Sequence, residues 1–223
     1  MAKTATSSSV SSKADVPAFF ISQLFSESWQ IFKKRWLVLL GFLIGYIALS
    51  LIGNWANETL VKSMGMPVLF FLLYYLFSLV IGMGFTKILI KLSRDEDAGL
   101  SDFFAAAPYI IKYVLGNLLY MLIVVVGILL LVVPGIVWAI KYMYIPYLII
   151  DKGMGPLQAM RASAKMTNGV KWDLVGFSMA SALLMYSGLI LLIVGVFVTI
   201  PVAMIAMFRL YTLMTKRPGV LDA

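Results

Sequence analysis

Apolar residues fill four long stretches of the chain, and most polar residues lie in the gaps between them. The stretches cover residues 36–53, 67–92, 113–150 and 172–215. A helix that crosses the hydrocarbon core of a bilayer needs about 20 mostly apolar residues. Each stretch is therefore long enough to cross a membrane, and the pattern predicts an all-α, polytopic membrane helix bundle.

The third stretch is too long for a single crossing. As one helix it would extend about 57 Å, nearly twice the thickness of the hydrocarbon core. Pro134-Gly135 lies near its middle, where a turn is expected. We therefore predict two helices joined by a tight turn. The alternative is a re-entrant segment over residues 135–150, which requires non-helical backbone that is sheltered by protein.

The fourth stretch is also too long for one crossing, since a single helix would extend about 66 Å. Gly195 and Pro201 bracket the turn that we predict there. The total is six transmembrane helices in three hairpins, which form one domain over residues 19–215. The tail 1–18 is rich in Ser, Ala and Thr and is predicted to be disordered, and residues 216–223 form a short C-terminal tail.

Basic residues predict the orientation of the helices. Lys and Arg gather before the first stretch, in every second connection and after the last stretch, while the alternate connections carry only Lys62 or none. Cytoplasmic loops carry such an excess of basic residues. Both termini are therefore expected in the cytoplasm. The same rule accounts for the net charge of +8, so no nucleic-acid partner is predicted.

Composition excludes several kinds of chemistry. The chain is 62% hydrophobic and only 13% charged, and it contains no Cys and no His. Disulfides, thiolate nucleophiles, imidazole bases and the usual zinc ligands are therefore absent. Enzyme motifs are missing as well. We predict no catalytic residue, no metal and no cofactor, and a protein that is not an enzyme.

A short amphipathic segment precedes each predicted hairpin and ends at a basic–aromatic pair. The pairs are Arg35-Trp36, Lys112-Tyr113 and Lys171-Trp172. In the second segment Ser101 or Asp102 is a candidate N-cap, and in the third Pro156 suits the first turn. We expect short helices on the cytoplasmic face, with their apolar sides in the acyl boundary. The alternative is that they are connectors that pack on the bundle.

Lys141 and Arg209 stand inside the predicted helices, with Lys87 towards the inner end of the second helix. They are candidate functional residues because an intramembrane charge is costly. Lys141 is followed by Tyr142 and Tyr144. It is expected to point into the bundle towards an anionic or polar group, or to pack against carbonyls or the neighbouring rings. Arg209 lies near the inner boundary and either reaches the interface or has a buried functional role.

Four further residues at the inner ends of the helices are candidates for lipid binding or for a clamp between segments: Asp151, Arg161, Lys165 and Lys171. Asp151 is expected to pair with Arg161 or Arg209. The predicted partners of the protein are membrane lipids, in particular anionic ones, and either a second copy or another membrane protein. Small residues at helical spacing, Gly41 with Gly45 and Gly176 with Ala180, allow close helix packing within or between chains.

Several short motifs resemble the YciC-like family of uncharacterised bacterial inner-membrane proteins, which is related to the membrane domain of some glycerophosphoryl diester phosphodiesterases. The resemblance covers about residues 113–215. The motifs are Val133-Pro134-Gly135-Ile136, Asp151-Lys152, Ala159-Met160-Arg161 with Ser163, and Phe208-Arg209-Leu210-Tyr211. It implies a six-helix fold in the bacterial cytoplasmic membrane and no known activity. Lys141 departs from the family pattern, where an apolar residue is expected.

These patterns together predict a non-enzymatic membrane protein that acts through lipid or protein contacts, as a scaffold, an assembly factor or a factor in membrane homeostasis. The first alternative is a small permease or channel, with a path lined by Lys141 and the neighbouring tyrosines. A lipid-modifying enzyme is the second alternative.

Overall fold

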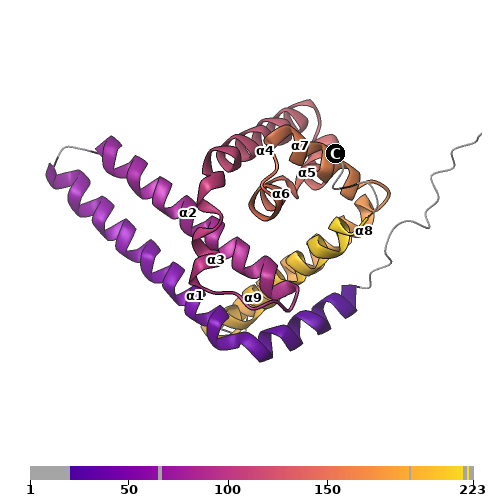
Figure 1. Cartoon of the computed structure of the whole chain (residues 1–223), viewed down its shortest axis with the longest axis horizontal. Helices are drawn as coiled ribbons and strands as arrows, with labels where there is room; N and C mark the ends of the chain where they lie inside the picture. Colours follow the sequence, from indigo (N-terminus) through magenta and orange to yellow (C-terminus); the bar gives the residue numbers. More distant parts are fainter. Residues whose placement is uncertain (1–20, 65–66, 191, 218–219, 221–223) are drawn as a thin grey trace, which may run out of the picture.

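The computed structural model describes residues 21–64, 67–190, 192–217 and 220, and the regular elements in them are all helices. They are α1 (Ile21–Met64), α2 (Pro67–Ser93), α3 (Leu100–Phe104), the 3₁₀ helix η2 (Ala107–Tyr109), α4 (Ile110–Leu130), α5 (Val132–Tyr142), α6 (Ile145–Lys152), α7 (Pro156–Met166), α8 (Lys171–Ile190) and α9 (Leu192–Thr215). Much of α1 and α2 forms an arm that projects from the other helices (Figure 1). The all-α prediction is confirmed. The predicted tail 1–18 and most of 216–223 lie outside the described residues.

Five segments of the described chain are long and apolar enough to cross a membrane. They are Ile21–Ala56, Leu72–Ser93, Ala107–Leu130, Val132–Lys152 and Phe197–Thr215. Large apolar side chains stay exposed along these helices, with Leu129 79% and Leu51 65% exposed. Exposed apolar surface of this extent is typical of contact with lipid. The chain is therefore a multi-pass membrane protein; α8, the predicted fifth crossing, is not among the five segments.

Helix α1 contains a kink at Arg35, where φ is −124° and ψ is 20°. The kink falls at the predicted boundary between an amphipathic segment and the first crossing. The amphipathic part packs on α8 and α9: Phe25 stacks on Phe177, and Glu27 pairs with Arg209. This first segment is thus a connector that packs on the bundle, which was the alternative expectation.

Helices α4 and α5 form a hairpin around Leu131, whose backbone is extended. Pro134 lies in the first turn of α5. The backbone N–H groups of a first turn have no hydrogen-bond partner within the helix, so the N–H that proline lacks costs no helical hydrogen bond there. Tyr120 Oη of α4 donates to the carbonyl of Ala139 at 3.2 Å, and Lys112 Nζ donates to the carbonyl of Gly153 at 2.9 Å. The chain after the turn therefore runs antiparallel to α4 along its whole length, which favours a hairpin over the re-entrant alternative.

The predicted fourth helix is nevertheless divided into α5 and α6. The break at residues 143 and 144 has a local cause, which is Pro146 in the first turn of α6. A proline ring clashes with the carbonyl four residues earlier and disfavours helical backbone at the preceding residue. The sequence therefore held the signal for this break.

The predicted turn between Gly195 and Pro201 is wrong. Both residues lie inside α9, and α8 and α9 meet at residue 191, which is outside the described residues. A Cβ on Gly188 of α8 would meet Gly195 and Thr199 of α9, so the small residues mark a close helix contact. Pro201 is tolerated because proline within a membrane helix does not have to end it.

The other two amphipathic segments also pack on the bundle. Helix α7 buries Ala159, Ala162, Ser163 and Met166, and Pro156 stands in its first turn as predicted. Helix α3 is shorter than expected, and its N-cap is Gly99 rather than Ser101 or Asp102. Asp102 still stabilises this helix start, because its Oδ2 accepts the Gly99 N–H at 3.0 Å.

Candidate functional site

Asp151, in the last turn of α6, is the centre of a group of charged and polar side chains. Arg94 donates from Nη1 to Oδ1 at 3.0 Å and from Nη2 to Oδ2 at 2.6 Å, and the Tyr211 hydroxyl donates to Oδ2 at 3.1 Å. Lys87 Nζ lies 3.6 Å from Oδ1 and donates to the Asp151 carbonyl at 3.0 Å. We call these four residues the Asp151 cluster.

The carboxylate at the centre of this cluster is almost completely buried, since the Asp151 side chain is only 3% exposed. A buried charge is tolerated only when it is paired and hydrogen-bonded, and the two-pronged contact with Arg94 has the strongest geometry for such a pair. The cluster joins α6 to the end of α2 and to α9. Its geometry is that of a clamp between helices that are far apart in the sequence.

The partners predicted for Asp151 are wrong. Arg161 lies exposed on α7, and Arg209 binds elsewhere. The Nε of Arg209 donates to Glu27 Oε2 at 3.0 Å, and its Nη1 donates to the Ser93 carbonyl at 2.9 Å. Arg209 therefore joins α9 to α1 and α2, a bridging contact that neither of its expected roles described.

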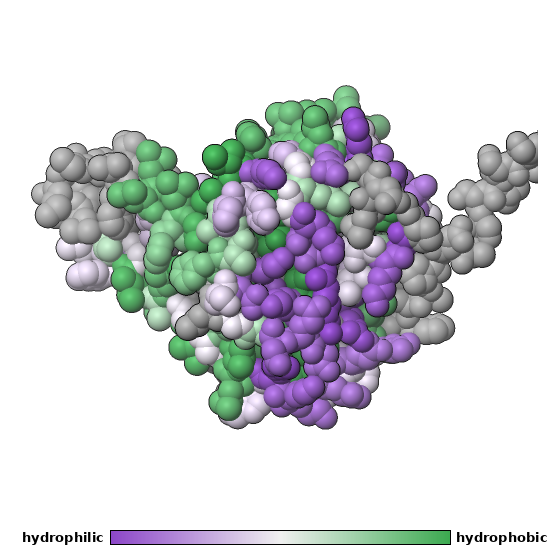
Figure 2. Space-filling model, viewed as in Figure 1, coloured by the Kyte–Doolittle hydropathy of each residue, from purple (hydrophilic) through white to green (hydrophobic). Residues whose placement is uncertain are grey.

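Three more ion pairs lie at the same end of the bundle. They are Lys34–Asp95 at 3.0 Å, Arg35–Asp97 at 2.7 Å and Lys91–Asp102 at 2.7 Å. The Lys91 ammonium and the Gly99 N–H lower the pKa of Asp102 by stabilising its charged form. The kink of α1 and the C-terminal part of α2 are thus tied to α3 and to the loop that leads into it. In Figure 2 hydrophilic surface gathers in the middle of the view, and much of the coloured part of the arm is hydrophobic.

Lys141 does not meet an anionic group among the described residues. Its amine lies 5.2 Å from the centre of the Tyr142 ring, which is the cation–π alternative. The Lys141 carbonyl accepts hydrogen bonds from Ser163 Oγ at 2.9 Å and Thr167 Oγ1 at 3.2 Å. Lys141 therefore lies next to polar side chains at α7, and its surroundings are not purely apolar.

Tyr144 belongs to a packed group of aromatic rings next to the Asp151 cluster. Its ring centre lies 5.8 Å from that of Tyr211 and 6.3 Å from that of Tyr147, and Tyr147 packs edge-on against Phe208 at 5.2 Å. Tyr144 and Tyr211 are both fully buried. The Tyr144 hydroxyl has no hydrogen-bond partner within the described chain.

These two tyrosines provide a matched pair of substitutions. We expect Tyr144→Phe to leave the free energy of unfolding unchanged or to raise it by about 1 kcal/mol, because it removes an unpaired buried hydroxyl. Tyr211→Phe should lower it by about 1.5–3 kcal/mol, because a hydrogen bond to a charged carboxylate is lost. Unfolding in mixed micelles by titration with SDS measures both values, and equal effects would contradict the assigned hydrogen bonds.

The remaining candidates for lipid binding lie near α7. Arg161 and Lys165 are exposed on this helix, while Lys171 is partly buried at the start of α8. Lys152 Nζ lies 3.7 Å from Asp151 Oδ2. Arg217, near the end of the chain, donates to the carbonyls of Met166 and Asn168. The structure thus brings basic residues from α6, α7 and the segment after α9 to one end of the bundle.

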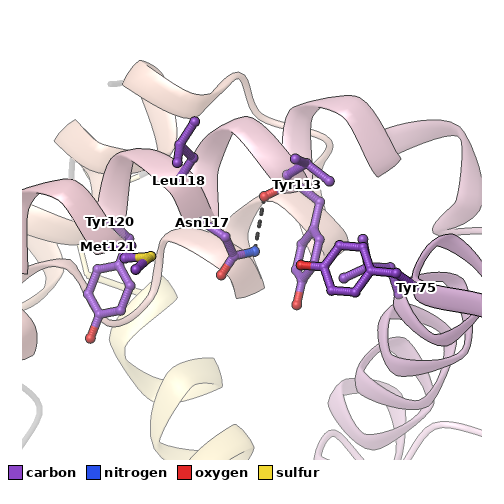
Figure 3. A pocket seen from close by; sticks show the side chains of 8 residues that line it. Tyr75, Tyr113, Asn117, Leu118, Tyr120 and Met121 are labelled. Carbon is purple, nitrogen blue, oxygen red and sulfur yellow. Dashed lines mark hydrogen bonds between the residues drawn. The ribbon is translucent and has the colours of Figure 1, made fainter. Parts of the chain in front are cut away.

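A groove between α2 and α4 encloses about 430 Å³ and is lined by Tyr75, Leu79, Tyr113, Val114, Asn117, Leu118, Tyr120 and Met121. Figure 3 shows Tyr113, Asn117 and Tyr120 on one side of α4, with the ring of Tyr75 beside Tyr113. Asn117 Nδ2 donates to the backbone carbonyl of Tyr113 at 3.0 Å. Analysis of the sequence missed this groove because no single motif marks a space between two helices.

Arg94 and Glu27 are functional candidates that analysis of the sequence did not single out, and it named Tyr211 only as part of a motif. Asp151 lies 57 residues from Arg94 and 60 from Tyr211, so no local spacing reveals these contacts. Within the described residues no group of His, Cys, Asp or Glu is arranged to hold a metal ion. Comparison with known proteins finds no matching family model, no matching curated protein and no matching solved structure.

Proposed function

We propose that the chain is a non-enzymatic protein of the bacterial cytoplasmic membrane that acts through contacts with anionic lipids and partner proteins. The observation that carries this proposal is the excess of positive charge at one end of the bundle. Three cations, Lys87, Arg94 and Lys152, lie within 4 Å of the single Asp151 carboxylate, and Arg161 is exposed nearby. Such an excess attracts anionic headgroups.

The proposal includes six crossings with both termini in the cytoplasm. The contacts Lys34–Asp95, Arg94–Asp151 and Glu27–Arg209 join the inner ends of α1, α2, α6 and α9. These ends would then lie on one side of the membrane, and their basic character would make that side cytoplasmic. Membership of the YciC-like family is part of the same proposal, and its basis is the set of motifs in residues 113–215.

A permease path along Lys141, Tyr142 and Tyr144 is the less favoured function. Tyr144 is fully buried against Tyr147 and Tyr211, which leaves no open space beside its ring. The Lys141 amine is already placed over Tyr142. Association with a second copy of the chain stays a prediction. Helix α1 is the surface on which to test it, because Gly41 and Gly45 are exposed there and a Cβ on either would meet nothing within 4 Å.

Charge reversal on α7 tests the lipid contact. We expect the double variant Arg161→Glu and Lys165→Glu to lower the anionic phospholipid that co-purifies with the protein by roughly tenfold or more, since each basic residue near the surface contributes about 1 kcal/mol. Mass spectrometry of extracted lipids measures the change. The matched control, Arg161→Lys with Lys165→Arg, keeps the charge and should keep the lipid. An unchanged lipid content in the reversed variant would refute the proposed role.

A further inference from the structure

Both walls of the groove between α2 and α4 belong to candidate membrane spans, Leu72–Ser93 and Ala107–Leu130. The outward-facing side chains beside it are apolar and exposed, such as Leu122 at 61%. A molecule that fills the groove therefore comes from the membrane. Its volume of about 430 Å³ lies in the range of ligand pockets.

The depth of the groove matches one leaflet of the bilayer. Its lining on α4 runs from Tyr113 to Met121, which corresponds to about 12 Å along a helix. Half of a hydrocarbon core about 30 Å thick is about 15 Å. The lining begins directly after Lys112, at the basic end of the bundle. The groove therefore has the length and position of an acyl chain in the basic-side leaflet.

The lining also offers partners for the polar part of a lipid. Asn117 Nδ2 donates to the Tyr113 carbonyl at 3.0 Å, which uses one of the two hydrogens of its amide group. An amide or a phenol in hydrocarbon is costly without partners, and the ester and glycerol oxygens of a phospholipid are partners of the required kind. Lys112 is exposed; its ammonium donates to the Gly153 carbonyl at 2.9 Å and lies 5.4 Å from the centre of the Tyr109 ring. Neither contact neutralises its charge, which can therefore attract a headgroup phosphate.

We propose that this groove binds one anionic phospholipid. Its headgroup lies at Lys112, its glycerol and ester region at Tyr113 and Asn117, and one acyl chain along Leu118 and Met121. The inference deepens the proposed function, because it rests on anionic lipid as the partner and assigns that lipid a defined place. It differs from the general attraction of α7 for headgroups, since the groove selects by shape as well as by charge.

Photolabelling of the full chain tests the site. The protein is reconstituted in phosphatidylcholine vesicles that contain phosphatidylglycerol with a photoactivatable acyl chain, and labelled peptides are mapped by mass spectrometry. We expect label to concentrate on residues 113–121. Met121→Trp, which fills the groove, should lower that label about tenfold, equivalent to about 1.4 kcal/mol of binding. Leu129→Trp, on an exposed position of the same helix, should leave it unchanged.

A second variant tests the headgroup. Lys112→Glu should abolish the preference for labelled phosphatidylglycerol over labelled phosphatidylcholine, while thermal unfolding of each variant shows that the fold is kept. Label spread evenly over α4, including Leu122 and Leu129, would show ordinary boundary lipid and overturn the proposal. So would equal labelling by the two lipids. The α7 charge reversal reports on the proposed function separately, because it changes neither the walls of the groove nor Lys112.

Discussion

Replacing Asp151 with alanine is expected to lower the free energy of unfolding by about 3–5 kcal/mol, the largest effect of any single substitution considered for this protein. The loss arises because Arg94 and Lys87 would keep their charges in a nearly closed site without the carboxylate that balances them. The Asp151 side chain is 3% exposed and the Arg94 side chain 20%. Titration of the purified protein with SDS in mixed micelles measures the change.

Asp95 provides the matched control for this prediction. Asp95 pairs with Lys34 at 3.0 Å, but the Asp95 side chain is 56% exposed and the Lys34 side chain 60%. An exposed ion pair contributes about 0–1 kcal/mol, so Asp95→Ala should have little effect. A double-mutant cycle between Asp151→Ala and Arg94→Ala then isolates their coupling. Equal losses for Asp151→Ala and Asp95→Ala would show that the Asp151 cluster does not hold α2, α6 and α9 together.

Substitution of Gly135 is expected to have an effect of the same order as the loss of the Tyr211 hydrogen bond. A Cβ at this position would lie 2.8 Å from the backbone nitrogen of Ile128 and 2.9 Å from its Cα. Backbone atoms cannot move aside as a flexible side chain can, so α4 and α5 must separate. Overpacking of this kind costs about 1–3 kcal/mol. Gly135→Ala should therefore destabilise the protein by that amount in the same SDS titration.

Gly41 is the control for Gly135. A Cβ there would meet no atom within 4 Å, and alanine favours a helix by up to about 1 kcal/mol relative to glycine. Gly41→Ala should leave stability unchanged or raise it slightly. If Gly135→Ala were equally harmless, the close approach of α4 and α5 would be refuted, and with it the tight turn at Leu131.

The sequence predicted those parts of the fold that depend on local patterns. Runs of apolar residues gave the helices, and the basic–aromatic pair Arg35-Trp36 marked the kink in α1. Pro134 marked the turn into α5. One local signal was missed, because Pro146 breaks the fourth helix. Another was misread, because Gly195 and Pro201 lie inside α9. A proline in the first turn of a helix marks where that helix begins, whereas a proline further along a membrane helix can be tolerated. The two cases differ only in where the helix begins.

The candidate site was harder to predict because its contacts join distant segments. Asp151 was singled out correctly as a charged residue at a helix end, but its partner Arg94 could not be identified from spacing alone. Arg209 was likewise noted, and its bridge to Glu27 spans 182 residues. Charge shows which residues need partners. Only the packing of α2, α6 and α9 decides which partners they find.

The central claim about topology, that the basic end of the bundle lies in the cytoplasm, is tested most directly by a pair of reporter fusions. Green fluorescent protein, which is fluorescent in the cytoplasm, and alkaline phosphatase, which is active in the periplasm, are each fused after Lys152. A parallel pair is fused at residues 65–66, between α1 and α2. The account predicts a cytoplasmic signal after Lys152 and a periplasmic one at residues 65–66. A periplasmic signal after Lys152 would contradict it.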